Sequence, residues 1–178
     1  MSRGQIMRRH CLRNIMPDLR PSFLTTRHEF FGTFSQLQEK MRELIERNPE
    51  EDNARVYWRR FGEVMHYMAD YFTFPHNRTY KGSLAEHNSY EAELKNCLKE
   101  CILSGNADSQ LEEAKHFDSF EELVGYIRER HACYLESPRC IADDIRFILR
   151  VCYQVIQGIF QLCLRRQFHM EGRPVTAI

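Results

Sequence analysis

The sequence lacks the features that mark membrane, secreted and nucleic-acid-binding proteins. Lysine plus arginine and aspartate plus glutamate both number 25 in 178 residues, so the chain has no formal net charge. Nucleic-acid binding needs a clustered basic excess, and none is expected here. The start of the chain is basic but has no continuous apolar core, so we predict no secretory signal. The best apolar stretch, residues 151–164, is shorter than the roughly 18 residues of a membrane span, so we predict no transmembrane segment.

The cysteines give no sign of a disulfide framework. An odd number cannot all pair within one chain, and no CxxC spacing occurs. Cys97 and Cys101 share a helical face and could in principle join a metal site, but small reduced thiols are the favoured interpretation. Reduced thiols suit the cytoplasm, which is the predicted location. The seven residues are Cys11, Cys97, Cys101, Cys133, Cys140, Cys152 and Cys163.

Several catalytic signatures are also absent. His28-Glu29 lacks the second histidine of an H-E-x-x-H protease. There is no His-Asp dipeptide, which an HD-type phosphohydrolase needs, and no serine or cysteine stands in a recognisable nucleophile elbow.

The apolar residues recur at helical spacing, and no strand-like alternation bounded by turns appears. We therefore predict an all-α fold, a single-domain multi-helix bundle over residues 1–178. The last helix is apolar on nearly all sides in its second half, so we place it at the centre, and residues 168–178 would be a mobile tail. The expected helices span residues 26 or 28 to 47, 52 or 53 to 72, 83 to 103, 118 or 119 to 134, and 137 to 167, with a polar short helix or loop at 107–117.

One stretch, residues 64–94, concentrates metal-binding side chains in the pattern H-x3-D-x5-H-x10-H-x3-E. The pattern consists of His66, Asp70, His76, His87 and Glu91. The first two share a helical face because they are four residues apart, and the last two do so on a second helix. A proline directly before His76 ends the first helix, so this histidine would project from the exit turn. Imidazole and carboxylate are the ligands of catalytic zinc, so we predict a multinuclear zinc site between helices.

A bland interpretation exists for each of these residues alone. A His and a Glu four apart are common on solvated helical faces, where they bind no metal. Five such residues around one turn favour a metal site. His116, His131 and His169 lack partners at ligand spacing, so we interpret them as packed or surface residues.

The stretch resembles the zinc-dependent phospholipase C family, the bacterial type that hydrolyses phosphatidylcholine. The resemblance is carried by HYMAD at 66–70, FPH at 74–76 and HNSYE at 87–91, which repeat the family's order of ligands. It implies that His76, His87 and Glu91 hold one zinc. His66 and Asp70 would serve a second metal, and Asp70 could bridge to a third.

The same resemblance extends upstream to two further ligands. Asp18 follows Pro17 as in the family's Pro-Asp element, and His28 matches the next histidine ligand. The resemblance implies that both bind zinc. Asp18, at the metal edge, would also orient or deprotonate the attacking water. Taken alone, a Pro-Asp is usually a turn or a cap, and His28 would be a residue in the first turn of a helix.

The family's third metal is held partly by an N-terminal tryptophan and by a histidine shortly after it. This sequence has neither in a matching place, since its early histidine, His10, lies only eight residues before Asp18. We therefore expect residues 1–17 to be an incomplete N-terminal segment, with two zinc sites supplied and the third lacking ligands. If an upstream segment is missing, the protein would be secreted, as the best-known members of the family are.

The resemblance implies a zinc-dependent phosphodiester hydrolase that acts on glycerophospholipids. A metal-activated water would attack the phosphate and release diacylglycerol and a phosphorylated head group. The expected partners are a phospholipid or other phosphodiester and, transiently, a membrane surface, with no nucleic acid. Two alternatives stay open: a zinc nuclease-type phosphodiesterase of related architecture, and a non-catalytic metal- or lipid-binding helical domain with an incomplete site.

Overall fold

The computed structural model describes residues 30–47 and 53–170, and within them every regular element is helical. The predicted all-α fold is therefore confirmed. Asp18, His28 and the remaining residues of segment 1–29 lie outside the described part, as do residues 171–178. The elements are α2 (Phe30–Glu46), α3 (Ala54–Tyr71), the 3-10 helix η2 (Phe74–His76), α4 (Leu84–Leu103), α5 (Asn106–Gln110), α6 (Phe120–Glu136) and α7 (Ile141–Met170).

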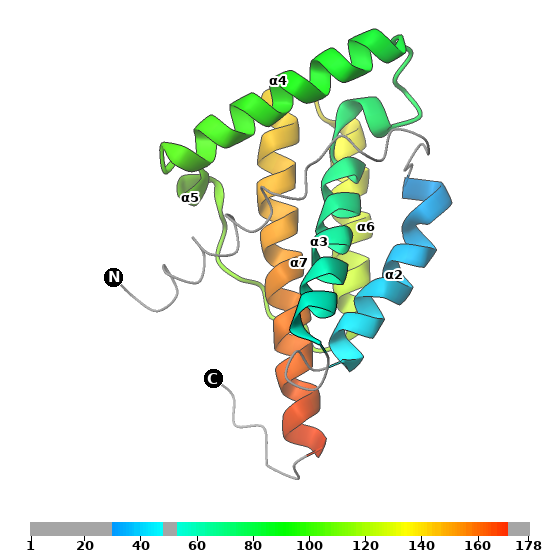
Figure 1. Cartoon of the computed structure of the whole chain (residues 1–178), viewed down its shortest axis with the longest axis vertical. Coiled ribbons are helices and arrows are strands. Elements are labelled where there is room, and N and C mark those ends of the chain that lie inside the picture. Colours follow the sequence, from blue (N-terminus) through cyan, green and yellow to red (C-terminus); the bar gives the residue numbers. More distant parts are fainter. Residues whose placement is uncertain (1–29, 48–52, 171–178) are drawn as a thin grey trace.

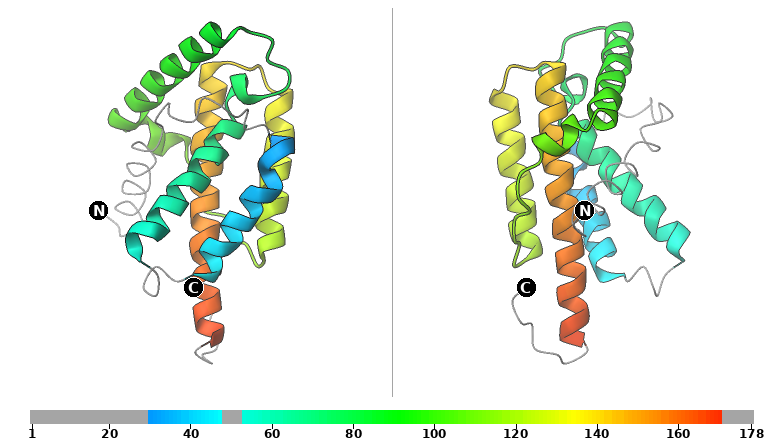
Figure 2. Two further views of the ribbon diagram at one scale, coloured as in Figure 1. Left: turned by 45° about the vertical axis from the view of Figure 1, so that its right-hand side comes forward. Right: turned by 90° about the vertical axis from the view of Figure 1, so that its left-hand side faces the viewer.

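Helix α7 is the core of the bundle, as predicted from its apolar second half. It packs against α2, α3, α4, α5 and α6. Figure 2 shows it between α6 on one side and α2 and α3 on the other. Its inward side chains are almost completely buried, and they include Val151, Val155, Ile156 and Ile159. Burial of this apolar surface is the main force that assembles the other helices around α7.

Helix α7 bears on the prediction that the chain has no transmembrane segment. Residues Ile141–Phe168 form a helix that is long and apolar enough to cross a membrane by length and composition. The helix continues on both sides of residues 151–164, but charged residues and glutamines interrupt it, so it contains no uninterrupted apolar run of that length. In addition, 61% of its most apolar window is buried inside the fold. Most of this window is thus covered by the neighbouring helices.

Helix α2 has an apolar stripe, in line with the helical spacing of apolar residues in the sequence. Its buried residues recur at helical spacing and face α3 and α7. Helix α3 starts directly after Asn53, whose side-chain oxygen accepts a hydrogen bond from the backbone N–H of Arg55 at 3.0 Å. The stripe of α2 consists of Phe34, Leu37, Met41 and Leu44.

Helix α4 lies across one end of the bundle formed by α2, α3, α6 and α7 (Figure 1). Its start has a complete capping box. The Ser83 side chain accepts from the Glu86 backbone N–H, and the Glu86 carboxylate accepts from the Ser83 backbone N–H at 2.7 Å. The helix therefore begins at a fixed residue, as predicted. This fixed start sets the positions of His87 and Glu91 one and two turns further on.

The junction between α6 and α7 differs from the prediction. The last helix was predicted to begin at residue 137, where Ser137-Pro138 fits the cap-then-proline order of a helix start. Instead, Ser137 is the C-cap of α6, and its hydroxyl donates to the carbonyl of Tyr134 at 2.8 Å. Pro138 follows the helix end, where proline is also common because it cannot continue a helix. Helix α7 starts at Ile141.

Two shorter predictions are refined by the structure. At the start of α6 the cap is Ser119, whose side chain accepts from the Glu122 backbone N–H, so the alternative cap Asp118 is not used. The polar stretch predicted at 107–117 contains α5 only as far as Gln110, and an extended connection follows. The six cysteines in the described residues form no disulfide with one another.

Candidate metal centre

The five ligand types of the sequence pattern come from three consecutive elements. His66 and Asp70 lie on the last two turns of α3, and His76 ends η2. His87 and Glu91 lie on the first two turns of α4. Residues 73–82, between the two predicted helices, contain η2, and Pro75 lies inside η2 rather than at the end of the first helix. This short turn folds the chain back so that α4 faces the end of α3.

The structure brings three of these side chains together at one point. The Oε1 atom of Glu91 lies 2.8 Å from Nε2 of His76 and 3.0 Å from Nε2 of His87. One ligand atom from each residue lies within 4.8 Å of the others. The two imidazole rings are 5.0 Å apart and inclined at 71°, so both edges face the carboxylate.

The other two residues continue this cluster toward α3. Asp70 lies between the two groups, with one carboxylate oxygen 3.9 Å from Nε2 of His76 and the other 3.5 Å from Nε2 of His66. The side chains of His66, Asp70 and His76 are 10–16% exposed, and that of Glu91 is 32% exposed. The cluster therefore lies at the boundary between core and solvent, where a small ligand can reach it.

The electrostatics of the cluster favour a cation. Burial acts to lower the pKa of His76, but the hydrogen bond to Glu91 and the charges of Asp70, Glu91 and Asp144 outweigh it and raise the pKa above its usual value. Burial acts to raise the pKa of Glu91, but the imidazoles of His76 and His87 lower it below its usual value. Positive charge is thus stabilised at the point where these side chains meet.

The residues fit a zinc ion. Two imidazole nitrogens and one carboxylate oxygen are the protein ligands of many catalytic zinc sites, which keep a fourth position open. Zinc–ligand distances of about 2.0 Å separate two ligands of a tetrahedral ion by about 3.3 Å. The observed separations of 2.8 and 3.0 Å between Glu91 and the two imidazoles are close to this value. Because the third separation, between the two imidazoles, is also within 4.8 Å, side-chain rotations would place all three around one ion.

Sequence reasoning missed the residues that hold the η2 turn. The Asn77 amide donates to the Thr73 carbonyl at 2.9 Å, and its oxygen lies 3.3 Å from Nε2 of His131 on α6. His131 is buried and stacks on Phe30 with ring centroids 3.9 Å apart, so its interpretation as a packed residue is confirmed. Burial lowers the pKa of His131 to about 4, so it is neutral at pH 7. The only sequence feature that could have indicated this role is the asparagine directly after the Pro-His pair.

Aromatic rings line the outer side of the cluster. Tyr80 lies edge-on to His87, with ring centroids 6.0 Å apart, and to Phe74 at 5.2 Å. A Cβ atom on Gly82 would come within 2.3 Å of the Tyr80 hydroxyl, so only glycine allows this ring to lie over the chain. The rings of Phe74 and Tyr80 therefore narrow the path by which a ligand could reach His87 on the side of residues 73–82.

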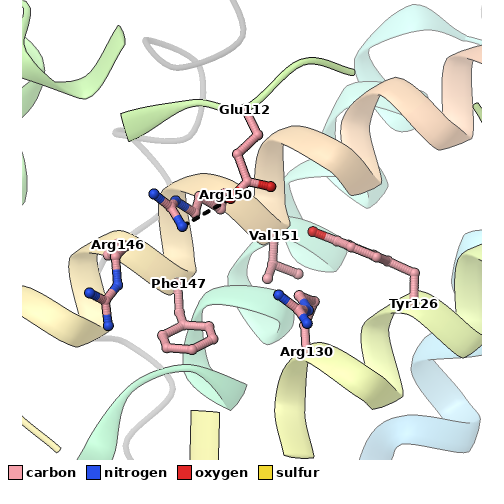
Figure 3. A pocket seen from close by; sticks show the side chains of 7 residues that line it. All are labelled: Glu112, Tyr126, Arg130, Arg146, Phe147, Arg150 and Val151. Carbon is pink, nitrogen blue, oxygen red and sulfur yellow. Dashed lines mark ion pairs between the residues drawn. The ribbon is translucent and has the colours of Figure 1, made fainter. Parts of the chain in front are cut away.

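A second polar group lies elsewhere and shares no residue with the cluster. A hollow of about 160 Å³ between α6, α7 and the segment after α5 is lined by three arginines (Figure 3). Each of them has its own acidic partner: Arg150 pairs with Glu112 at 2.9 Å, Arg130 with Glu129 at 2.9 Å, and Arg146 with Asp143. The hollow therefore has no uncompensated charge for a ligand to neutralise, and we assign it no function.

The sequence comparisons agree with the geometry. The family model described as zinc dependent phospholipase C matches residues 11–141, which is most of the chain and includes all seven predicted ligands. No curated protein and no solved structure matches the chain significantly. Asp18 and His28 lie within the matched residues but outside the described structure, so their roles stay predictions. The chain belongs to the zinc-dependent phospholipase C family.

Proposed function

We propose that this protein is a zinc-dependent hydrolase that cleaves glycerophospholipids in the manner of a phospholipase C. The observation that carries the proposal is the convergence of His76, His87 and Glu91 on one point in a chain of this family. Neither fact alone would suffice, since similar clusters occur without metals and family membership does not guarantee activity.

In this proposal the side chains divide into two groups. His76, His87 and Glu91 hold one zinc, while His66 and Asp70 contribute to a second metal together with Asp18 and His28. Asp70 lies between the groups, with oxygens 3.9 Å from His76 and 3.5 Å from His66. It is therefore placed to keep the two groups at a fixed separation. Bound zinc supplies a Lewis acid that polarises phosphate oxygens and lowers the pKa of water.

The reaction proposed is hydrolysis of the bond between phosphorus and the glycerol oxygen. Water attacks phosphorus, the bond to the glycerol oxygen breaks, and this oxygen takes up a proton to give diacylglycerol. The phosphorylated head group is the second product. Asp18 is proposed to orient the water or to accept its proton. The exposed edge of Glu91 and the rings of Phe74 and Tyr80 would face the substrate at the mouth of the site.

The test measures metal content and turnover on the same purified sample. Elemental analysis should find zinc bound, and a chromogenic phosphocholine ester should be hydrolysed in a chelator-sensitive way. Activity should return when zinc is added back. Protein that binds no zinc even after reconstitution would contradict the proposal, because the cluster would then be an ordinary group of paired side chains.

Two further assays separate the alternatives. A zinc nuclease of related architecture would hydrolyse single-stranded DNA faster than the phosphocholine ester, and we expect the reverse. A non-catalytic domain would bind zinc and hydrolyse neither substrate. That outcome would contradict the proposed hydrolase.

A further inference from the structure

One buried carboxylate links the two segments that carry the zinc ligands. Asp144 lies in the first turn of α7 and is 0% exposed. It accepts three hydrogen bonds, from the backbone N–H of Phe74 at 2.9 Å and from the hydroxyls of Tyr90 at 2.9 Å and Tyr134 at 2.7 Å. A buried carboxylate is costly unless it is well hydrogen-bonded, so this arrangement needs all of its donors.

Two of these donors stand beside the candidate ligands. Phe74 is the first residue of η2, and His76 is its last. Tyr90 directly precedes Glu91 and follows His87 by three residues on α4. The Oδ2 atom of Asp144 accepts from both Phe74 and Tyr90, so one oxygen ties η2 to α4. The third donor, Tyr134, lies on α6, which carries none of the predicted ligands.

The hydrogen bond from Tyr90 to Asp144 holds α4 in one rotational position about its axis. Successive residues on a helix point about 100° apart, so Tyr90 faces α7 while Glu91 faces η2. When Tyr90 is held against Asp144, the direction of Glu91 is fixed. The bond to Phe74 fixes the turn that presents His76 from the opposite side. The Oδ2 atom of Asp144 therefore fixes the positions of both η2 and α4, and with them the distance between Glu91 and His76.

We propose that Asp144 is a positioning residue that preorganises His76, His87 and Glu91 for zinc through Phe74 and Tyr90. The proposal rests on the zinc site of the proposed function and adds a residue to it. Asp144 lies beyond residues 11–141, the part that matches the family model. Groups that orient metal ligands through hydrogen bonds typically change metal affinity when they are replaced, although they never touch the ion.

The two tyrosines provide a matched pair of variants. Tyr90→Phe and Tyr134→Phe each remove one hydroxyl from the same carboxylate, but only Tyr90 stands on a ligand-bearing helix. Zinc affinity is measured by competition with a chromogenic chelator, and the melting temperature is measured on metal-free protein. Cobalt replaces zinc in a parallel sample, because its visible absorption reports the geometry of the ligands.

We expect Tyr90→Phe to weaken zinc binding about 3- to 10-fold, as loss of one hydrogen bond would. Asp144→Asn, which disturbs all three bonds, should weaken it at least about 10-fold. Tyr134→Phe should lower the melting temperature of the metal-free protein as much as Tyr90→Phe does. It should change zinc affinity less than about twofold and leave the cobalt spectrum unchanged.

The outcomes separate this inference from the proposed function. Equal losses of zinc affinity in the two tyrosine variants would overturn it, since Asp144 would then act on stability alone. Unchanged zinc affinity in Tyr90→Phe and Asp144→Asn, together with lower melting temperatures, would also overturn the inference. If Asp144→Asn fails to fold, the tyrosine pair decides. Zinc binding without turnover in the wild type would contradict the proposed function and leave the positioning role testable by affinity.

Discussion

Two polar clusters of this molecule contain similar numbers of charged groups but differ in how those groups are paired. In the metal cluster one oxygen of Glu91 serves two imidazoles, at 2.8 and 3.0 Å. In the arginine-lined hollow each cation has its own carboxylate, as in the 2.9 Å pair of Arg150 with Glu112. Ligand atoms that converge on one point can be satisfied together by a single cation, whereas separate pairs need nothing further. Convergence, rather than the number of charges, therefore identifies the candidate site.

The largest effect expected from this comparison is at the shared carboxylate. Glu91→Gln keeps the shape of the side chain but removes the charge that both imidazoles face. We expect zinc affinity to fall at least about 100-fold, more than for loss of a group that only orients a ligand. Isothermal titration with zinc on metal-free protein measures this loss. Glu93→Gln, an exposed residue of the same helix, is the matched control and should bind zinc like the wild type.

The next effect concerns the number of metals rather than the affinity of one. His66→Ala removes a predicted ligand of the second metal and leaves His76, His87 and Glu91 in place. We expect elemental analysis to find one zinc fewer per chain, with hydrolysis reduced by more than about tenfold because the second ion no longer binds phosphate. His116→Ala, at a histidine whose side chain is 69% exposed, should change neither value. Retained hydrolysis in folded His66→Ala protein would remove this residue from the site.

Some features of this arrangement are determined by residues close together in the chain, and these are predictable from the sequence. The apolar stripe of α2 and the capping box at Ser83 are local patterns, and the structure has both. The order of His66, Asp70, His76, His87 and Glu91 is also local, since two helices and one turn contain it. Those parts of the fold and site could be predicted from composition, spacing and resemblance.

The other features depend on contacts that no local pattern contains. Ser137-Pro138 fits both a helix start and a helix end, and only the packing of α6 decides between them. Tyr90 and Tyr134 meet Asp144 across 54 and 10 residues of sequence, and nothing in an acidic first turn of an apolar helix indicates this.

A third prediction sharpens the contrast between histidines inside and beside the cluster. Burial lowers the pKa of His131 to about 4, whereas its usual value is 6.5. Because the folded-state value is lower, the stability from neutral His131 is complete above pH 6.5 and is lost as the pH falls toward 4. Between pH 7 and pH 5 this loss is about 2 kcal/mol, at about 1.4 kcal/mol per pKa unit.

His131→Gln removes this titration while keeping a polar side chain beside Asn77. Urea unfolding of metal-free protein at pH 7 and pH 5 gives the free energy of unfolding for both chains. The variant should be less stable than the wild type at pH 7, because it loses the stacking on Phe30, and the difference should shrink by about 2 kcal/mol at pH 5. An unchanged difference would show that His131 is protonated in the folded protein at pH 5.

The smallest effect is expected in the arginine-lined hollow, where the same glutamate-to-glutamine change can be made. Glu112→Gln breaks the ion pair with Arg150, whose partners are 38% and 47% exposed, so the free energy of unfolding should fall by less than about 1 kcal/mol. Arg150 keeps its bond to the Gln110 carbonyl at 3.0 Å, which limits the change further. Zinc affinity should stay within about twofold of the wild type, against the large loss in Glu91→Gln.

Inorganic phosphate should not raise the melting temperature of the wild type, because each guanidinium in the arginine-lined hollow already has an acidic partner. A clear rise with phosphate would show that paired charges can also form a binding site, and convergence would no longer distinguish the two clusters.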